Sequence, residues 1–371
     1  GQPSYRLASG EVELYVTRKG GHMGPVTFDR KGRKIKPYSV APWAREKLAR
    51  GTPPIIETLR GDFFCLPFGG NDTPYRGEQH PIHGETANAS WSFKGIEKDV
   101  GQQILHLSLR MKAREGRVDT RIRLVKGHNA VYLQHRVSGM SGPMNPGHHA
   151  MLKFPEAPGS GLISTSPFVF GQTFPGAFEL PENGGYSCLK HGAVFKDLSK
   201  VPMLNGESTD LTRFPARKGF EDLVMVVADE RLPLAWNAVS FPGEGYAWFA
   251  LRDPRVLRQT VFWISNGGRH YAPWNGRHTA VMGLEEVTTY FGFGLAESVR
   301  KNALSAKGHP TALRLDARRP LAVNYIMGVA KIPRSFGRVK RVEPDKGGRV
   351  ALVDAKGKSV KAPVDIDFLA D

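Results

Sequence analysis

Short runs in which apolar and polar residues alternate recur along the chain, and glycine and proline interrupt them at close intervals. Residues 12–17 alternate in this way, and three similar runs, 105–111, 118–124 and 131–135, follow one another closely. Alternation with a period of two places successive side chains on opposite faces of a strand. The 42 glycines and 27 prolines favour turns between strands over long helices. The sequence therefore predicts an all-β protein, a large antiparallel β-sandwich.

The turn at residues 114–117 joins two of these runs and predicts a hairpin within an antiparallel meander that has one solvated face. Further strands are expected at 223–227, 246–251, 260–264, 279–284 and 350–353. Two short helices are expected, at 42–50, with Pro42 in the first position, and at 295–304.

The 371 residues suffice for one large all-β domain or two ordinary domains. No internal repeat or low-complexity linker divides the chain, so residues 1–371 are predicted to form a single domain. Strands at 336–342, 349–354 and 359–368 are expected to complete a sheet; a separate small C-terminal domain is the alternative. Residues 155–220 are rich in Gly, Pro and Ser, and such a segment is expected to be functional or to cover a sheet edge.

The formal net charge of +17 raises the question of a nucleic-acid partner. Residues 331–361 hold ten Lys and Arg and three Asp and Glu, but few aromatic residues lie among them. Elsewhere the basic residues are spread along the strands. This pattern argues against nucleic acid and favours a basic surface that aids solubility or attracts anionic sugars. No run approaches the roughly 18 apolar residues of a membrane span, so no membrane partner is expected.

Cys65 and Cys188 lie far apart in the sequence and lack the spacing of metal ligands. Two separate buried thiols are expected, with a disulfide as the alternative. The chain begins with Gly1 and Gln2, which suggests removal of a secretory signal and a periplasmic or secreted location. A cytoplasmic location is the alternative.

Polar residues that suit a carbohydrate gather in two stretches, 68–72 and 80–85, with Trp91 shortly after them. Sugars offer hydroxyls for hydrogen bonds and an apolar face that stacks on aromatic rings. A purely structural alternative makes these turn residues with a core tryptophan. A third interpretation is a metal site formed by His80, His83 and Glu85.

Two other stretches supply an acid and a base. Residues 143–149 end in His148 and His149, which point to opposite faces if they lie on a strand, so that only one faces a given pocket. In residues 281–286, Met282 and Leu284 mark the core face. Glu285 then lies on the opposite face, where the small Gly283 leaves room for a ligand.

Taken together, these stretches resemble the aldose 1-epimerase, or galactose mutarotase-like, family over about residues 5–300. His83-Gly84 with Trp91 resembles its His-Gly motif, and residues 143–149 resemble the segment that ends in the catalytic histidine, here His149. Leu284-Glu285 resembles the segment with the catalytic glutamate. The sequence departs from the family pattern in His148 for asparagine, in Glu286 for proline, and in 150–152, where an aromatic pair is common.

The resemblance implies a galactose mutarotase-like supersandwich and a monosaccharide or oligosaccharide partner. Glu285 would take the proton of the anomeric hydroxyl and His149 would protonate the ring oxygen, the two lying on opposite sides of the sugar. Such proton transfers need no cofactor and no metal. Arg76 or Arg277 would lower the pKa of the base. The substrate-binding residues would be Asn71, Arg76, His83, Trp91, His148, Trp274 and Arg277.

Two other functions fit the same fold. One is a non-catalytic carbohydrate-binding protein, favoured by the departures at His148 and Glu286. The other is a polysaccharide-processing enzyme, whose acidic glycan would match the basic surface. The sequence leaves open the sugar, its anomer, a phosphate group on it, the choice between Glu285 and Glu286, and the oligomeric state.

Overall fold

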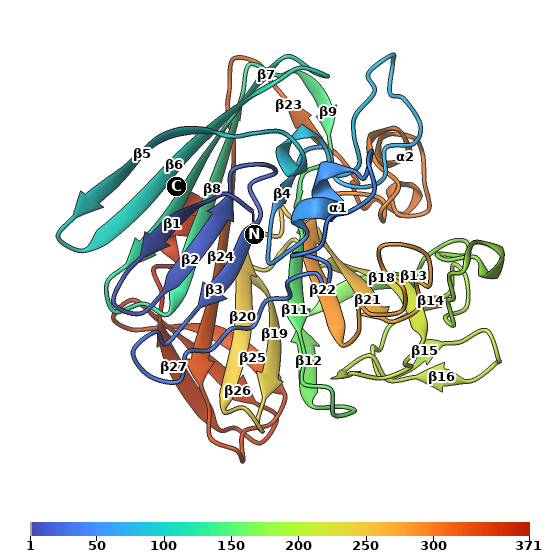
Figure 1. Cartoon of the computed structure of the whole chain (residues 1–371). Coiled ribbons are helices and arrows are strands. Elements are labelled where there is room, and N and C mark those ends of the chain that lie inside the picture. The colour runs from blue at the N-terminus through green and yellow to red at the C-terminus, as the bar shows by residue number, and fades with distance from the viewer. Residues whose placement is uncertain (1) are drawn as a thin grey trace.

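The computed structural model describes residues 2–371, and two large antiparallel sheets dominate it (Figure 1). The nine-stranded sheet has the order β17 (Arg213–Phe214), β12 (Gly161–Thr165), β19 (Ala235–Phe241), β20 (Tyr246–Arg252), β24 (Leu321–Lys331), β8 (Ala130–Ser138), β7 (Gly116–Val125), β6 (Gln102–Met111), β5 (Ser92–Asp99). The eight-stranded sheet has the order β14 (Val194–Phe195), β13 (Phe168–Thr173), β18 (Phe220–Ala228), β21 (Gln259–Asn266), β22 (Val281–Val287), β10 (Gly147–His148), β4 (Phe64–Cys65), and β11 (Ala150–Lys153) also pairs with β22.

Smaller elements surround the two large sheets. The short strands are β1 (Ser4–Ala8), β2 (Glu13–Thr17) and β3 (Met23–Thr27) in one sheet, and the pairs β9 (Gly142–Met144) with β23 (Leu313–Leu315) and β15 (Val201–Pro202) with β16 (Ser208–Thr209). The α-helices are α1 (Pro54–Thr58) and α2 (Leu295–Val299), and single 3₁₀ turns lie at Glu85–Ala87, Pro181–Asn183, Ser305–Lys307 and Asp367–Ala370.

The alternation of apolar residues places one face of each large sheet in a shared core. Val224 and Met282 of the eight-stranded sheet belong to the same buried cluster as Leu107 and Trp248 of the nine-stranded sheet. The predicted hairpin is confirmed, because β6 pairs antiparallel with β7 and Leu109 lies opposite Val118. The sandwich prediction is therefore confirmed.

The eight-stranded sheet is also apolar on its outer face. A second buried cluster joins Leu223 and Trp263 of this face to Ile55 and Leu59, which α1 and the residue after it contribute. Every residue of β22 is buried as a result. The side chains on the outer face of β22 can therefore line a pocket beneath α1 and the neighbouring loops.

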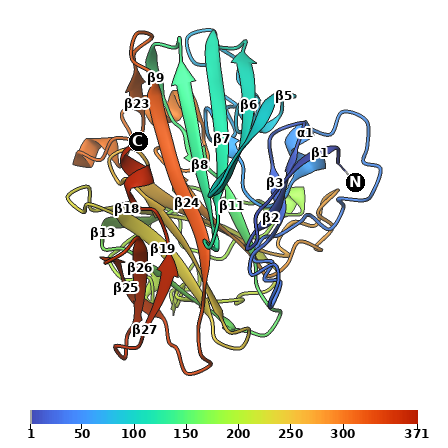
Figure 2. The same cartoon turned by 90° about the vertical axis from the view of Figure 1, so that its left-hand side faces the viewer.

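The C-terminal strands differ from the expectation that they complete a sheet. β25 (Val339–Asp345), β26 (Arg349–Asp354) and β27 (Ser359–Pro363) pair only with one another. A third buried cluster packs Val342 and Leu352 of this small sheet against Phe249 and Leu251 on the outer face of the nine-stranded sheet. Figure 2 shows the small sheet lying against β19 and β24. Its apolar face is thus buried by face-to-face packing rather than by edge pairing.

The helix expectations were only partly met. Residues 42–50 contain turns and no helix, and α1 begins at Pro54 instead. Trp43 explains the difference, because its ring packs edge-on against Trp274 with centroids 4.7 Å apart and its Nε1 donates to the carbonyl of Ile56. Burial of this side chain overrides the local helix propensity. α2 begins at Leu295 as expected but ends at Val299.

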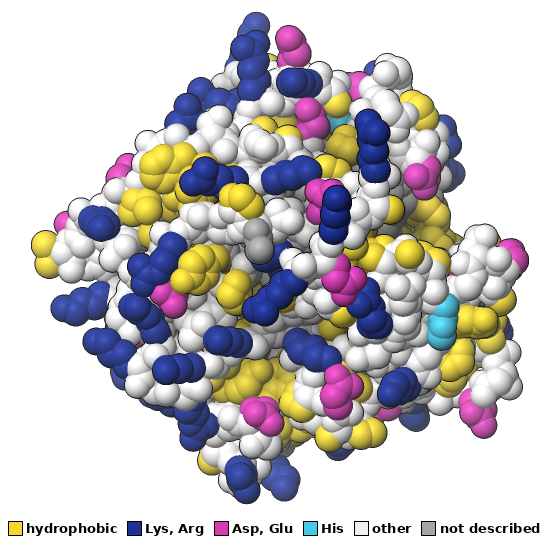
Figure 3. All heavy atoms as spheres, in the orientation of Figure 1, with side chains coloured by type: hydrophobic (Ala, Val, Ile, Leu, Met, Phe, Trp, Pro, Cys, Tyr) yellow, Lys and Arg dark blue, Asp and Glu magenta, His cyan; other side chains and the backbone are white. Residues whose placement is uncertain are grey.

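Lysine and arginine side chains are dispersed over the face seen in Figure 3 rather than gathered in one patch. No helix within residues 2–371 has the length and apolar character to cross a membrane. Cys65 and Cys188 are both buried free thiols, which confirms the expectation of two separate thiols.

Candidate functional site

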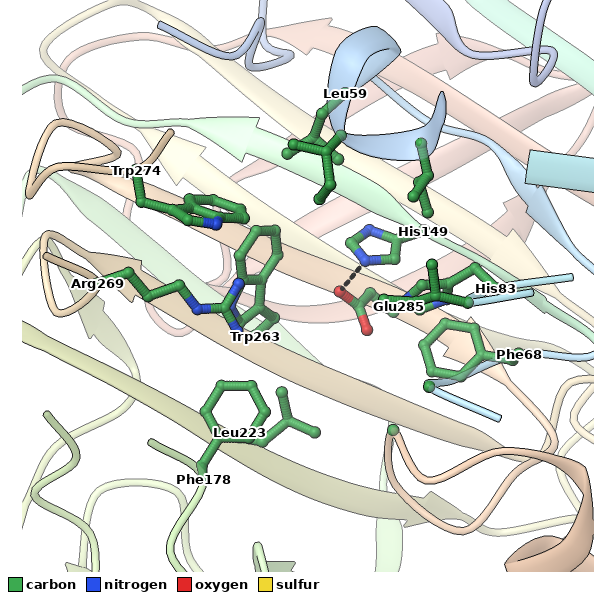
Figure 4. A pocket seen from close by; sticks show the side chains of 15 residues that line it. Leu59, Phe68, His83, His149, Phe178, Leu223, Trp263, Arg269, Trp274 and Glu285 are labelled. Carbon is green, nitrogen blue, oxygen red and sulfur yellow. Dashed lines mark ion pairs between the residues drawn. The ribbon is translucent and has the colours of Figure 1, made fainter. Parts of the chain in front are cut away.

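A pocket of about 170 Å³ lies on the outer face of the eight-stranded sheet, between β22, α1 and the surrounding loops. Nine of its fifteen lining residues are aliphatic or aromatic, two are glycines, and four are polar. The four polar residues are His83, His149, Arg269 and Glu285. Figure 4 shows three of them close together and Arg269 on the other side of Trp263.

Glu285 and His149 are in direct contact in this pocket. The Oε1 atom of Glu285 lies 3.1 Å from Nε2 of His149, and both side chains are buried. β22 directs Glu285 outward, and Gly283, two residues earlier on the same face, leaves space for its carboxylate. A Cβ at Gly283 would collide with Oε1 of Glu285. Figure 4 shows the second carboxylate oxygen pointing away from His149.

The backbone between β10 and β11 fixes His149. Its N–H donates to the carbonyl of Phe63 at 3.0 Å, and its ring stacks on the Phe63 ring with centroids 4.6 Å apart. Its neighbour His148 lies on the opposite face, as the alternation predicted. Nδ1 of His148 lies 2.9 Å from a carboxylate oxygen of Asp62, away from the pocket.

Burial moves the pKa values of this pair in opposite directions. Desolvation raises the pKa of Glu285 well above its ordinary value, and the positive charge of Arg269 opposes that rise. Desolvation also lowers the pKa of His149 well below its ordinary value, and His83 adds to the effect. Both shifts favour the uncharged forms, a protonated Glu285 and a neutral His149.

His83 contributes a hydrogen-bond donor to the same end of the pocket. The backbone N–H of Gly69 donates to Nδ1 of His83 at 3.3 Å, so in the neutral ring the proton resides on Nε2. Burial lowers the pKa of His83 to about 3, which keeps the ring neutral. Its ring packs edge-on against that of His149, with centroids 4.9 Å apart.

Arg269 and aromatic rings form the opposite wall. The guanidinium carbon lies 4.6 Å from the ring centroid of Trp274 and 5.4 Å from that of Trp263. Nε of Arg269 donates to Oε1 of Glu179 at 2.6 Å. Phe178 adds a further ring 5.5 Å from the same guanidinium. These contacts hold Arg269 in one orientation as a fixed positive charge at the pocket wall.

A buried polar cluster supports this wall from behind. Trp263 Nε1 donates to Glu221 at 3.0 Å and Ser265 Oγ donates to the other oxygen of Glu221 at 2.8 Å. The ring of His278 stacks on Trp263 at an interplanar angle of 18°. Burial raises the pKa of Glu221 to about 8. The cluster therefore fixes the position of the indole ring.

Glu286 lies on the inner face of β22 and does not reach the pocket. It pairs with Arg252, accepts a hydrogen bond from Thr260 at 3.0 Å and contacts Asn237. Its side chain and that of Arg252 are both buried in the sandwich core. The structure therefore selects Glu285 as the carboxylate of the pocket.

Four of the residues proposed from the sequence line the pocket: His83, His149, Trp274 and Glu285. Five do not: Asn71, Arg76, Trp91, His148 and Arg277. His148 points into the sandwich, as described above. The remaining four are each held by other contacts.

Asn71 is buried and bridges backbone groups, because its Nδ2 donates to the carbonyls of Gly69 and Pro81 and its Oδ1 accepts from the N–H of Leu295. It supports the loop that carries His83. Trp91 is a core residue whose Nε1 donates to the carbonyl of Thr86 at 2.9 Å.

The two predicted arginines lie in exposed positions. Arg76 lies over the ring of Tyr75, 5.5 Å from its centroid, and Arg277 forms a bidentate ion pair with Glu46. The cation that lowers the pKa of Glu285 is therefore Arg269, not Arg76 or Arg277.

The sequence reasoning missed Arg269, Trp263 and Phe178. Trp263 lies directly opposite Gly283 in the β21–β22 pairing, a register that the sequence does not specify. Phe178 belongs to residues 155–220, the segment expected to be functional or to cover an edge. Arg269 follows two glycines after β21, and no motif marks it.

The alternative of a metal site finds no support in residues 2–371, where no group of three or more His, Cys, Asp or Glu side chains is arranged to hold a metal. His80 pairs with Glu78 at 3.0 Å, and Glu85 accepts from the backbone N–H groups of Lys112 and Ala113. These contacts hold His80 and Glu85 apart from His83.

No protein-family model and no curated protein sequence matches the chain. Solved structures do match its fold. A candidate aldose 1-epimerase from Escherichia coli K12 superimposes with a TM-score of 0.57 and 13% identity, covering 90% of this chain and 100% of that one. A galactose mutarotase related enzyme from Lactobacillus acidophilus gives 0.56 and 11%, covering 89% and 98%. A galactose mutarotase-like protein from Clostridium acetobutylicum gives 0.58 and 11%, covering 88% and 95%. The chain therefore has a galactose mutarotase-like fold.

Proposed function

We propose that the protein is a carbohydrate-active enzyme that interconverts sugar anomers, an aldose 1-epimerase activity in which Glu285 and His149 transfer the protons. The observation that carries the proposal is the 3.1 Å contact between these two side chains in a buried pocket. The fold shared with mutarotase-like proteins supports it but does not by itself indicate a reaction.

The 3.1 Å distance between Glu285 Oε1 and His149 Nε2 suits proton transfer to and from a hemiacetal. Ring opening removes the proton of the anomeric hydroxyl and adds one to the ring oxygen, and both oxygens are bonded to the same carbon. An acid and a base that touch can reach both oxygens from one side. This arrangement differs from the expectation that the two groups lie on opposite sides of the sugar.

The reactive form is the one in which Glu285 is ionised and His149 carries the proton, although burial favours the uncharged forms of both groups. Glu285 accepts the hydroxyl proton as a carboxylate, a form that the charge of Arg269 favours. His149 then holds the proton of the pair and delivers it to the ring oxygen. The C–O bond of the ring breaks, the aldehyde group rotates, and the reverse transfers close the ring as the other anomer. No net proton is gained or lost, so the reaction needs no cofactor.

Three further residues fit this proposal. Nε2–H of His83 is a neutral donor for the ring oxygen or an adjacent hydroxyl. The rings of Trp263 and Trp274 offer surfaces for the C–H face of a sugar.

Anomer exchange tests the proposal. Freshly dissolved α-anomers of a sugar panel are followed by polarimetry, and equilibrium exchange is measured by magnetisation-transfer NMR. We expect at least one sugar to equilibrate faster with enzyme than in buffer, and His149→Asn to abolish the acceleration. Binding of a sugar without acceleration would indicate a carbohydrate-binding protein instead.

A further inference from the structure

Three of the four polar side chains of the pocket gather at one end. Glu285, His149 and His83 lie together there, and in the proposed reaction all three act around the anomeric carbon. This leaves Arg269 as the only other polar side chain of the lining. Its Nε is already bonded to Glu179 and its plane is packed against aromatic rings, which leaves its two Nη groups as the donors not engaged by Glu179.

Most of the remaining lining cannot hydrogen-bond through its side chains, the indole N–H of Trp274 being the exception. Phe68, Leu223 and Trp263 border the space beside Glu285, and the indole N–H of Trp263 is already donated to Glu221. None of the fifteen lining residues is Asn, Gln, Asp, Ser or Thr. A common hexose has more ring hydroxyls than these few groups can satisfy, so some would lie against carbon atoms and lose their hydrogen bonds to water.

The apolar character continues to the rim of the pocket. Ile82, the neighbour of His83, is 37% exposed, and Ile56 of α1 is partly buried beside the opening. Ile82 and Ile56 extend the apolar wall to the rim, so the outer part of a ligand also meets carbon atoms.

We propose that the substrate is a reducing sugar whose ring hydroxyls are missing or are capped by methyl or acyl groups, with only the anomeric hydroxyl required to be free. The inference rests on the proposed function and names its substrate class. Methyl and acyl groups gain from burial against the aliphatic and aromatic wall, whereas free hydroxyls at the same positions lose hydrogen bonds.

The test compares matched sugars with the wild-type protein. Anomer exchange is measured for glucose and 2,3,4,6-tetra-O-methylglucose, and for galactose and 6-deoxygalactose, each relative to buffer. We expect kcat/KM for the capped or deoxygenated member to exceed that of its hydroxylated partner by about tenfold or more, the scale of discrimination in an apolar pocket. Equal or reversed preference would overturn this inference and leave the epimerase proposal standing.

A second measurement separates the two proposals if no sugar is epimerised. Trp263 and Trp274 line the pocket, so ligand binding is followed by tryptophan fluorescence. Tighter binding of tetra-O-methylglucose than of glucose, without exchange, would support the inferred ligand class and exclude the epimerase. If neither sugar binds, both proposals fail.

Variants test whether the preference for capped or deoxygenated sugars arises from the pocket lining. Ile82→Asn adds an amide at the rim, where exposure makes the change compatible with folding, and we expect the preference to fall severalfold. Leu223→Asn adds an amide in the buried wall and should act in the same direction. The matched control is Leu204→Asn, at a 54% exposed position that lines none of the described pockets, and the preference should stay unchanged.

Discussion

Glu285 and Glu286 are neighbours on β22 and serve opposite faces of one sheet. Glu285 enters the outer pocket beside His149, whereas Glu286 pairs with Arg252 inside the sandwich. Two adjacent carboxylates are thus buried in separate environments. One lines the candidate site, and the other holds an ion pair in the core.

Replacing these two residues should produce different defects. Glu285→Gln removes the proton acceptor, and we expect anomer exchange to fall by about 10²–10⁴-fold with the fold retained. Glu286→Gln leaves Arg252 buried without its countercharge, and we expect the free energy of unfolding to fall by about 3–5 kcal/mol. Exchange rates and urea unfolding curves measure the two effects. Full activity in Glu285→Gln would show that the pocket carboxylate is not the base.

Arg269 should set the pH dependence of the reaction. Its charge lowers the pKa of Glu285, so its removal in Arg269→Met raises that pKa. Because Glu285 must be ionised to accept a proton, the acidic limb of the kcat/KM profile should move to higher pH. Arg269→Lys keeps the charge and should move the limb less. Identical profiles for all three proteins would exclude this electrostatic role.

Glu221 should make stability depend on pH. Burial raises its pKa from an ordinary value of 4.5 to about 8, so between these values the folded protein binds a proton that the unfolded chain releases. Its contribution to stability is therefore present below pH 4.5 and declines up to pH 8, by at most about 1.4 kcal/mol per unit. Glu221→Gln removes this contribution. The difference in unfolding free energy between wild type and variant should follow this decline, and a constant difference would contradict it.

His83 should remain neutral throughout the physiological range. With a pKa of about 3 and an amide donating to Nδ1, its ring should carry a single proton on Nε2. Nitrogen-15 NMR shifts of the labelled imidazoles, assigned with His83→Gln, measure this directly between pH 5 and 8. A titration in that range would show that the ring acts as an acid rather than as a neutral donor.

The fold could be predicted largely because alternation reports which faces of a strand are buried. It marked Met282 and Leu284 as core residues and assigned Glu285 to the other face, as observed. Alternation does not say which sheet a strand joins. This is why the C-terminal strands were expected to extend a sheet, although they stack on one instead.

Strand alternation predicted the faces of His149 and Glu285, whereas His83 and Trp274, which also line the pocket, were proposed from loops by motif resemblance or residue type. His149 and Glu285 come from β-strand regions whose faces the sequence defines. Asn71 and Arg277 were chosen by residue type, and their side chains are committed to local partners. Arg269 reaches the pocket through a loop, and loop geometry depends on distant contacts such as that with Glu179.

Because Arg269 is held by Glu179, the two ends of the candidate site depend on different parts of the fold. Glu179 and Phe178 come from the segment between β13 and β14 at the edge of the sheet, whereas Glu285 lies on an interior strand. Edge loops tolerate substitutions and insertions far better than buried strands do. The loop, and with it the orientation of Arg269, can therefore vary while the position of Glu285 beside His149 stays fixed.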